Sequence, residues 1–277
     1  MFTFNEYDQL TEALITFAGK AYPKFGNVVI MAGGAGSGKG FVKDKLVGME
    51  GFVFDVDAMK SLAMKAPKLG SKVKDEFGVD LSNLNLKNSD DVFKLHAIIG
   101  DELKLDDKKL KTLYGSILTA DPDRKPNLIF DVTLKDLRKL DTISRAAKSL
   151  GYANEKIHIV WVVNDIEVAK AQNIKRDRTV PVEILINTHR GVSNTMNDII
   201  KMGKQITRYL DGDIVFAFNK VGVDTAVKKS GKGGSFVVDA DYFYVKRAGK
   251  KAIPLNKLSD EVKRKVSSYV PPDASWV

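Results

Sequence analysis

A glycine-rich octapeptide near the beginning of the sequence constrains the possible folds more than any other feature. In chain order it consists of Gly33, Gly34, Ala35, Gly36, Ser37, Gly38, Lys39 and Gly40. It follows the apolar run 28–31 and precedes a helix-like segment that begins at Phe41. A G-x-x-x-x-G-K spacing between a strand and a helix is typical of a phosphate-binding loop, and the alternative is an ordinary glycine-rich turn. We expect residues 33–41 to bind a nucleotide, with Lys39 at its terminal phosphates.

Gly40 departs from the usual form of this loop. At this position Ser or Thr normally supplies a hydroxyl to Mg²⁺. The ion must therefore be held by carboxylates, by Ser37 or by water, or be held more loosely.

Short apolar runs alternate with helix-like segments along the chain. The runs are 28–31, 52–54, 128–130, 157–163 and 214–218. Strands of a parallel sheet that is covered on both faces have this near-continuous apolar pattern. We predict an α/β fold of the P-loop NTPase type, a three-layer sandwich with a mostly parallel central sheet, whose ligands bind at the carboxyl ends of the strands.

Two segments predict additions around the first half of this core. Residues 4–22 space their apolar side chains helically, and we expect a docking helix within residues 1–25. The Lys- and Asp-rich stretch 60–120 is helical in pattern and too polar for central strands. It predicts a helical insertion into a core that spans 26–220.

The second half of the chain predicts a lid and a basic extension. A basic turn at 175–181 separates two helix-like segments, and we expect a lid over about residues 175–190. Residues 221–277 combine a Gly- and Lys-rich loop with strand-like runs at 236–238 and 242–245. They predict a basic C-terminal extension with short strands.

Composition narrows the partners and the compartment. The 44 Lys and Arg residues against 35 Asp and Glu give a formal net charge of +9, which favours nucleic acid as a partner. The alternative is a well-solvated, Lys-rich surface. Because the chain has no cysteine, no membrane-length apolar run and no signal-peptide pattern, we expect a cytoplasmic protein without membrane contact.

Acidic residues follow two of the expected strands. Asp55 and Asp57 lie two residues apart, so that in an extended segment both project to the same side. One can hold Mg²⁺ while the other accepts a hydroxyl proton, unless one of them caps the following helix. Asp131 and Thr133 end the next strand and suit metal or acceptor binding, with helix capping again as the alternative.

Arginines in the basic turn supply candidate cationic groups. Arg176 and Arg178 can fold over the phosphates and neutralise charge on a transferred group, although a solvated charge run is the alternative for either. Arg190 on the following helix is a weaker candidate. The three histidines are isolated in the sequence and receive no role.

The order of these motifs resembles the zeta-toxin-like branch of P-loop kinases, which also includes polynucleotide-type kinases and phage kinases of DNA bases. The motifs are 33–40, Phe54-Asp55-Val56-Asp57, 128–133 and Arg178-Thr179-Val180-Pro181. The resemblance covers about residues 26–220. It implies Asp57 as the catalytic base, Asp131 and Thr133 as acceptor or metal ligands, and Arg178, with Arg176 beside it, as the lid arginine. Asp131 replaces a Glu of the zeta toxins, which argues against their sugar-nucleotide acceptor.

The sequence thus predicts a Mg²⁺-dependent kinase that transfers the γ-phosphoryl group of ATP or GTP to an acceptor hydroxyl. In this hypothesis Lys39, Asp57, Arg176 and Arg178 are catalytic, and Asp55 and Asp131 bind the metal. The acceptor expected first is nucleic acid, at a 5′-hydroxyl or on a hydroxymethylated base such as 5-hydroxymethyluracil. One alternative is a zeta-toxin-like kinase of a small nucleotide or sugar nucleotide. Another is a non-catalytic protein that binds or assembles in response to a nucleotide.

Overall fold

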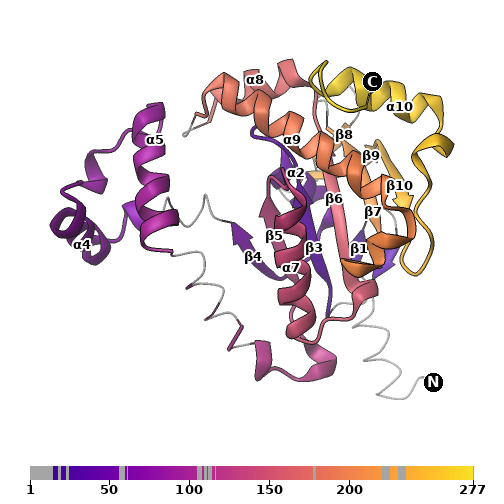
Figure 1. Cartoon of the computed structure of the whole chain (residues 1–277), viewed down its shortest axis with the longest axis horizontal. Helices are drawn as coiled ribbons and strands as arrows, with labels where there is room; N and C mark the ends of the chain where they lie inside the picture. Colours follow the sequence, from indigo (N-terminus) through magenta and orange to yellow (C-terminus); the bar gives the residue numbers. More distant parts are fainter. Residues whose placement is uncertain are drawn as a thin grey trace.

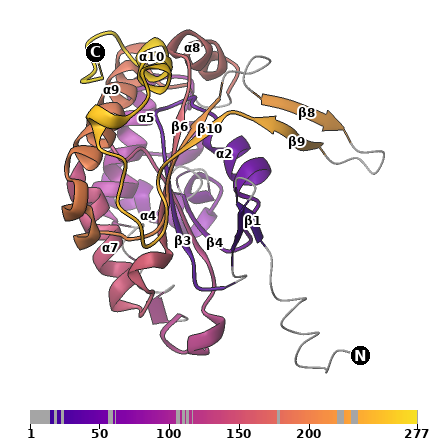
Figure 2. The same ribbon diagram turned by 90° about the vertical axis from the view of Figure 1, so that its right-hand side faces the viewer.

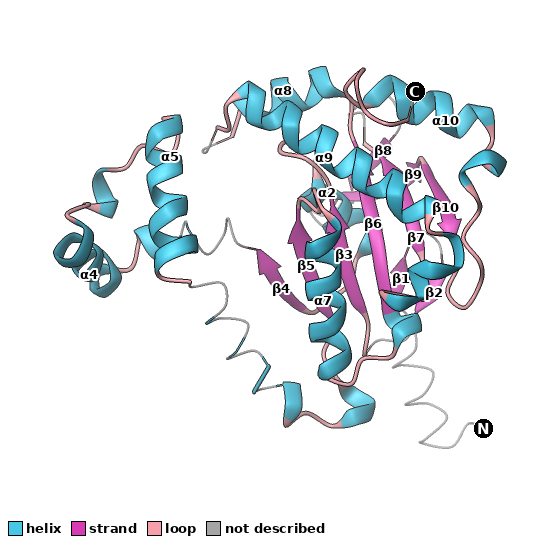
Figure 3. Ribbon diagram, in the orientation of Figure 1, coloured by secondary structure: helices cyan, strands magenta, loops and turns pink. Residues whose placement is uncertain are grey.

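A six-stranded sheet with helices on both faces forms the centre of the computed structural model (Figure 1, Figure 3). The structure describes residues 15–17, 20–22, 25–55, 60, 62–104, 108, 111, 114–115, 117–176, 179–219, 225–229 and 235–276. None of the helices in these ranges is both long and apolar enough to cross a lipid bilayer.

The strand order creates a crevice next to the glycine-rich loop. Across the sheet the strands are β4 (Phe52–Asp55), β5 (Leu128–Val132), β3 (Val28–Ala32), β6 (Ile157–Val163), β7 (Ile214–Phe218) and β10 (Tyr242–Lys246). All neighbours are parallel except β10, which runs antiparallel to β7. The chain leaves β3 for one side of the sheet and later crosses to the other side. Such a switch point opens a crevice at the carboxyl ends of the strands, and the predicted α/β fold is confirmed.

The sheet separates two hydrophobic clusters, as expected for a strand with side chains on alternating faces. From β3, Val28 and Ile30 enter the larger cluster, whereas Val29 and Met31 enter the smaller one. The larger cluster packs under α7 (Leu137–Ser149), α9 (Val182–Lys201) and α10 (Asp260–Tyr269), and the smaller one under α2 (Lys39–Val42) with the π-helical turn Lys43–Val47. Figure 2 shows these helices on opposite faces of the sheet. The remaining core helix, α8 (Ile166–Ile174), precedes the basic turn.

The helical insertion lies beside the β4 edge of the sheet (Figure 1). It contains α4 (Pro67–Phe77) and α5 (Ser89–His96), which continues as the π-helical segment Ala97–Glu102. Val73, Leu81 and Leu95 belong to a small hydrophobic cluster of its own. The insertion therefore has its own packing, and its residues Lys60 and Val92 line the pocket at the carboxyl edge of the sheet.

The C-terminal segment completes the core, contrary to the predicted extension over 221–277. β10 is an edge strand of the central sheet, and Val245, Val266 and Trp276 are buried in the larger cluster. Only the hairpin of β8 (Thr225–Lys229) and β9 (Ser235–Ala240) projects from the body (Figure 2). The pattern of residues 221–277 did not show this because β10 pairs with β7 across the intervening hairpin β8–β9, and local residue spacing does not encode that pairing.

The N-terminal segment also differs from its prediction. Where a docking helix was expected within 1–25, the structure describes an antiparallel pair of strands, β1 (Ile15–Phe17) and β2 (Lys20–Tyr22). Residues 1–14 lie outside the described residues. Isoleucine, threonine, phenylalanine and tyrosine all favour strands, and over this short stretch that preference outweighs the helical spacing.

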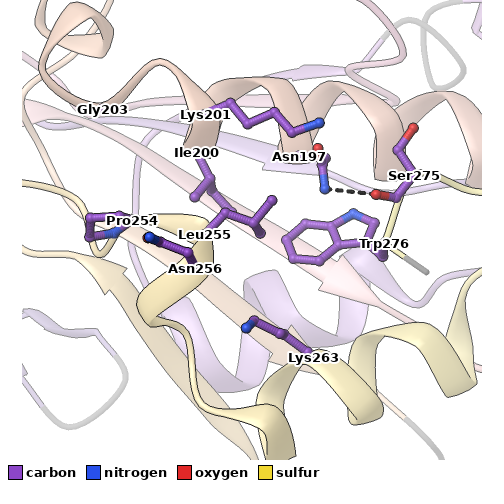
Figure 4. Close-up of a pocket in the computed structure, with 10 residues that line it drawn as sticks. All are labelled: Asn197, Ile200, Lys201, Gly203, Pro254, Leu255, Asn256, Lys263, Ser275 and Trp276. Carbon is purple, nitrogen blue, oxygen red and sulfur yellow. Dashed lines mark hydrogen bonds between the residues drawn. The ribbon is translucent and has the colours of Figure 1, made fainter.

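Trp276 packs against the second half of α9 and borders a cavity of about 530 Å³ (Figure 4). Its indole Nε1 donates a hydrogen bond of 2.8 Å to the Ser193 carbonyl. Its ring packs against Trp161 and Phe216, with centroid distances of 5.6 and 5.7 Å. Next to it, the side-chain amide of Asn197 donates to the Ser275 carbonyl at 3.0 Å. The last described residues are thereby fastened to α9.

Candidate functional site

The glycine-rich loop has the backbone geometry of a phosphate cradle. It leaves the carboxyl end of β3 and enters α2 through Gly38, whose φ of 85° lies in the left-handed region that favours glycine. No side chain caps the N-terminus of α2, whose first residues, Lys39, Gly40 and Phe41, line the pocket described below. Helix N-termini of this kind bind phosphate through their N–H groups and the helix dipole.

Lys39 lies over the loop and beside a carboxylate. Its Nζ donates to the carbonyls of Gly33 at 2.9 Å and Gly34 at 3.4 Å, and it is 3.6 Å from Oδ1 of Asp131. The ammonium group sits on a flexible four-carbon chain, so rotation about its side-chain bonds can carry it from these carbonyls to a phosphate. The structure thus brings Lys39 and Asp131 together, as the sequence predicted.

Asp55 and Asp131 are direct neighbours on adjacent strands. They are paired in the register of the parallel strands β4 and β5, whose backbones lie about 4.8 Å apart. The preceding residues, Phe54 and Phe130, are buried on the opposite face. Two carboxylates this close repel each other unless a cation lies between or beside them, and Lys39 already occupies one side. Both aspartates line the pocket, and Asp131 is next to Lys39.

Neither Asp131 nor Thr133 caps the next helix, which was the alternative to a binding role. α7 begins at Leu137, and its N-cap is Asp136, whose carboxylate accepts from the Lys139 amide at 3.1 Å. Asp131 and Thr133 instead line the same pocket as the loop.

That pocket has a volume of about 760 Å³, within the usual range for small-ligand sites. Besides loop residues 35–41, Asp131 and Thr133, it is lined by Asp55 and Arg176. Of the predicted site residues that the structure describes, all lie in the pocket wall except Gly33 and Gly34. These two glycines follow β3, and their carbonyls accept from Lys39. Asp57 and Arg178 lie outside the described residues, and their roles stay predictions.

The residues predicted to form a lid, about 175–190, comprise a turn and the first part of α9. α8 ends at Ile174 and α9 begins at Val182, so that only 175–181 connect the two. The side chain of buried Asn173 fixes the far end of this turn through both polar groups of Val180, at 2.7 and 3.0 Å. Thr179 contacts the insertion, because its N–H donates to Leu86 O and its hydroxyl to Lys87 O, each at 3.2 Å.

Arg190, the weaker arginine candidate, is not part of the pocket. Its Nε forms an ion pair of 2.7 Å with Asp273. On α9 the residue lies on the side that faces the C-terminal segment, so the helix places its charge away from the loop.

Several pocket residues were missed by the sequence analysis. Lys60, which is 5% exposed, lies in the pocket wall together with Lys135 and Lys139. A lysine has no distinctive spacing in a chain with 44 basic residues, so only the fold identifies these three. A Cβ at Gly40 would meet no atom within 4 Å. Crowding therefore does not explain why Ser or Thr is absent from this position.

His189 was assigned no role, yet it contacts the loop directly. The ring lies 5% exposed on α9, with Nε2 at 2.8 Å from the carbonyl of Ala35. A carbonyl only accepts, so Nε2 carries a hydrogen. Burial lowers the pKa of His189 to about 4; the charge of Lys39 lowers it as well, while the bond to Ala35 opposes the shift. The imidazole is therefore neutral at pH 7.

This shift predicts that the protein loses stability in mild acid. The pKa of His189 is about 6.5 in the unfolded chain and about 4 in the folded protein. At a pH between these two values, His189 binds a proton only in the unfolded chain. The stability that it contributes above pH 6.5 is therefore lost as the pH falls toward 4. The full loss is on the order of 3 kcal/mol. Urea unfolding between pH 4 and 8 should show a shallower pH slope for His189→Gln than for the wild type. Equal slopes would contradict the assignment.

Comparisons with known proteins show only distant likenesses. No family model and no curated protein matches the sequence. Chains from two structures of the AvrRxo1-ORF1:-ORF2 complex, one with sulphate ions and one with ATP, align over 91% of this chain at 14% identity, with TM-scores of 0.46 and 0.47. The present chain spans 65% of their length.

A chain from a structure of the PezAT chromosomal toxin-antitoxin system of Streptococcus pneumoniae aligns with 78% of the present chain at 13% identity and a TM-score of 0.41. The alignment covers 77% of the PezAT chain. Likenesses at this level carry no conclusion about chemistry, which must come from the residues of this chain.

Proposed function

We propose that this protein is a P-loop kinase of the zeta-toxin-like type, which transfers the γ-phosphoryl group of ATP or GTP to an acceptor hydroxyl. The observation that carries the proposal is the convergence of the glycine-rich loop, Lys39, the pair Asp55 and Asp131, and Arg176 around one pocket. Phosphoryl transfer needs this combination of a phosphate cradle, a cation site and cationic side chains, because catalysis rests on positioning and charge stabilisation.

In the proposed mechanism, loop amides and Lys39 hold the phosphates. Asp57, two residues beyond Asp55, accepts the proton of the acceptor hydroxyl. The hydroxyl oxygen forms a bond to the γ-phosphorus. The bond from that phosphorus to the β–γ bridging oxygen breaks, and the nucleoside diphosphate is released. Arg176 and Arg178 neutralise charge on the transferred group. A Mg²⁺ ion would be held by Asp55, Asp131 and the phosphates, and when bound it would neutralise charge on their oxygens.

The first acceptor class is nucleic acid, supported by the net charge of +9 and by the hairpin β8–β9, which projects from the body and carries Lys228 and Lys229 in its sequence. The second class is a small nucleotide or sugar nucleotide. It is supported by the contacts of Thr179 with Leu86 and Lys87, which join the lid turn to the insertion.

Label transfer from γ-labelled ATP tests the proposal and its acceptor. Separate reactions contain 5′-hydroxyl DNA, DNA with hydroxymethyluracil, RNA and UDP-sugars. Transfer to a nucleic acid that weakens as salt is raised supports the first class, and transfer to a UDP-sugar supports the second. Tight ATP binding without transfer to any acceptor would instead support a nucleotide-gated, non-catalytic protein. Competition by GTP measures the purine preference.

Asp57→Asn tests the proposed base. We expect the transfer rate to fall by about 10²-fold or more with ATP affinity nearly unchanged, because the amide cannot accept the acceptor proton. Asp90→Asn, at an exposed position on α5, is the matched control and should retain the wild-type rate. A wild-type rate in Asp57→Asn would remove this residue from the mechanism, whichever acceptor is used.

A further inference from the structure

Three consecutive carbonyl groups of the glycine-rich loop accept hydrogen bonds from buried side chains. The pairs are His189 Nε2 to Ala35 O at 2.8 Å, Asn164 Nδ2 to Gly36 O at 3.0 Å and Asn219 Nδ2 to Ser37 O at 2.8 Å. The three donor side chains are 5%, 1% and 3% exposed, in the same order. Each donor is therefore shielded from water, where a fixed partner is worth most.

The donors come from three different elements that meet only in the folded protein. Asn164 directly follows β6 and Asn219 directly follows β7, at the carboxyl edge of the sheet. His189 comes from α9, which packs on one face of that sheet. On the same helix, the Thr188 hydroxyl accepts from the Ala35 amide at 3.2 Å, so that both polar groups of Ala35 are held by α9.

The direction of these bonds determines where the loop amides point. In a trans peptide the C=O of one residue and the N–H of the next point in opposite directions. Carbonyls held against the protein body therefore turn the N–H groups of Gly36 and Gly38, which follow the first and third of these carbonyls, toward the pocket side of the loop. The Ser37 N–H already donates to Gly34 O at 3.2 Å, which tightens the turn from within.

The same side chains explain why the loop needs glycine at two positions. A Cβ on Gly38 would lie 2.0 Å from Nδ2 of Asn219, and one on Gly34 would lie 2.2 Å from Cδ2 of His189. Both distances are far below van der Waals contact. The donors thus pack directly on the backbone of the loop.

We propose that Asn164, Asn219 and His189 form a carbonyl clamp, a set of positioning residues that orients the loop amides for phosphate before the nucleotide arrives. The clamp deepens the proposed function, because it acts on the proposed nucleotide site. Donors that are already oriented need no reorganisation when charge arrives, and this raises both affinity and rate.

Asn219→Ala is the first test, with Asn127→Ala as the matched control. Asn127 is 3% exposed and donates from Nδ2 to the Glu50 carbonyl at 2.9 Å, but it precedes β5 at the opposite edge of the sheet. Both variants should lose thermal stability. Only Asn219→Ala should weaken binding of ATP, by about 10-fold, as expected for one buried hydrogen bond. Equal ATP affinity in the two variants would overturn the clamp.

His189 allows a rescue experiment. His189→Gln keeps an N–H donor at a similar reach, whereas His189→Phe keeps the ring but removes the donor. We expect ATP affinity and the ratio kcat/KM to fall about 10-fold in the Phe variant and to recover in the Gln variant. A Phe variant with wild-type affinity and rate would exclude His189 from the clamp.

Hydrogen exchange of residues 33–40 without nucleotide separates this inference from the proposed function. Faster exchange in Asn219→Ala and His189→Phe, with wild-type exchange in Asn127→Ala, supports the clamp even if the wild type transfers no phosphate. Unchanged exchange in all three variants overturns it, even if the wild type is an active kinase.

Discussion

Replacing Lys39 by alanine is expected to lower the rate of phosphoryl transfer by about 10²- to 10³-fold, the usual effect of removing one group that stabilises charge in a transition state. In the structure its ammonium group reaches the loop carbonyls of Gly33 and Gly34 and lies 3.6 Å from Asp131. It therefore lies between the glycine-rich loop and Asp131. Affinity for ATP should fall as well, because in the proposed mechanism the lysine holds the phosphates before transfer begins.

Lys43→Ala is the matched control for this measurement. Lys43 is also a lysine, at the start of the π-helical turn that follows α2, but its Nζ pairs with Asp44 at 3.4 Å and it does not line the pocket. Its variant should keep the wild-type rate with the same acceptor. If Lys39→Ala transferred phosphate as fast as Lys43→Ala, the loop would not be the nucleotide site.

Replacing Trp276 by alanine is expected to lower the free energy of unfolding by about 3–5 kcal/mol, the usual cost of removing a large buried aromatic side chain. The indole is 7% exposed, packs on Trp161 and Phe216, and loses a hydrogen bond to Ser193 O in the variant. Domains of this kind are stable by only about 5–15 kcal/mol, so the loss is a large share of the total.

Urea unfolding measures this effect, with Phe77→Ala as the control. Phe77 is 38% exposed on α4, and its loss should cost much less than that of Trp276. Trp276→Phe should recover part of the lost stability by refilling the space. A change below about 1 kcal/mol in Trp276→Ala would mean that residues 271–276 do not contribute to the core as the structure indicates.

The buried strands were predictable from the sequence because each is covered on both faces. Strands β6 and β7 have the bounds that their apolar runs predict, 157–163 and 214–218. The same rule led to Asp55 and Asp131, since polar residues at the carboxyl ends of parallel strands meet at one edge. Asn164 and Asn219 occupy equivalent positions after the next two strands. This rule could have identified them too.

The amino-acid sequence by itself determined the α/β class, and it located the glycine-rich loop and the acidic residues at the ends of the neighbouring strands, because these depend on short-range spacing and on apolar periodicity. Only the tertiary structure decided that β10 joins the sheet, that Asp136 rather than Asp131 or Thr133 caps α7, and that His189 contacts Ala35. The pairing of β10 with β7 and the contact of His189 with Ala35 join groups far apart in the chain, whose positions are set by the packing of helices and strands around a common core. The cap is a local bond, but which residue makes it depends on where packing lets α7 begin.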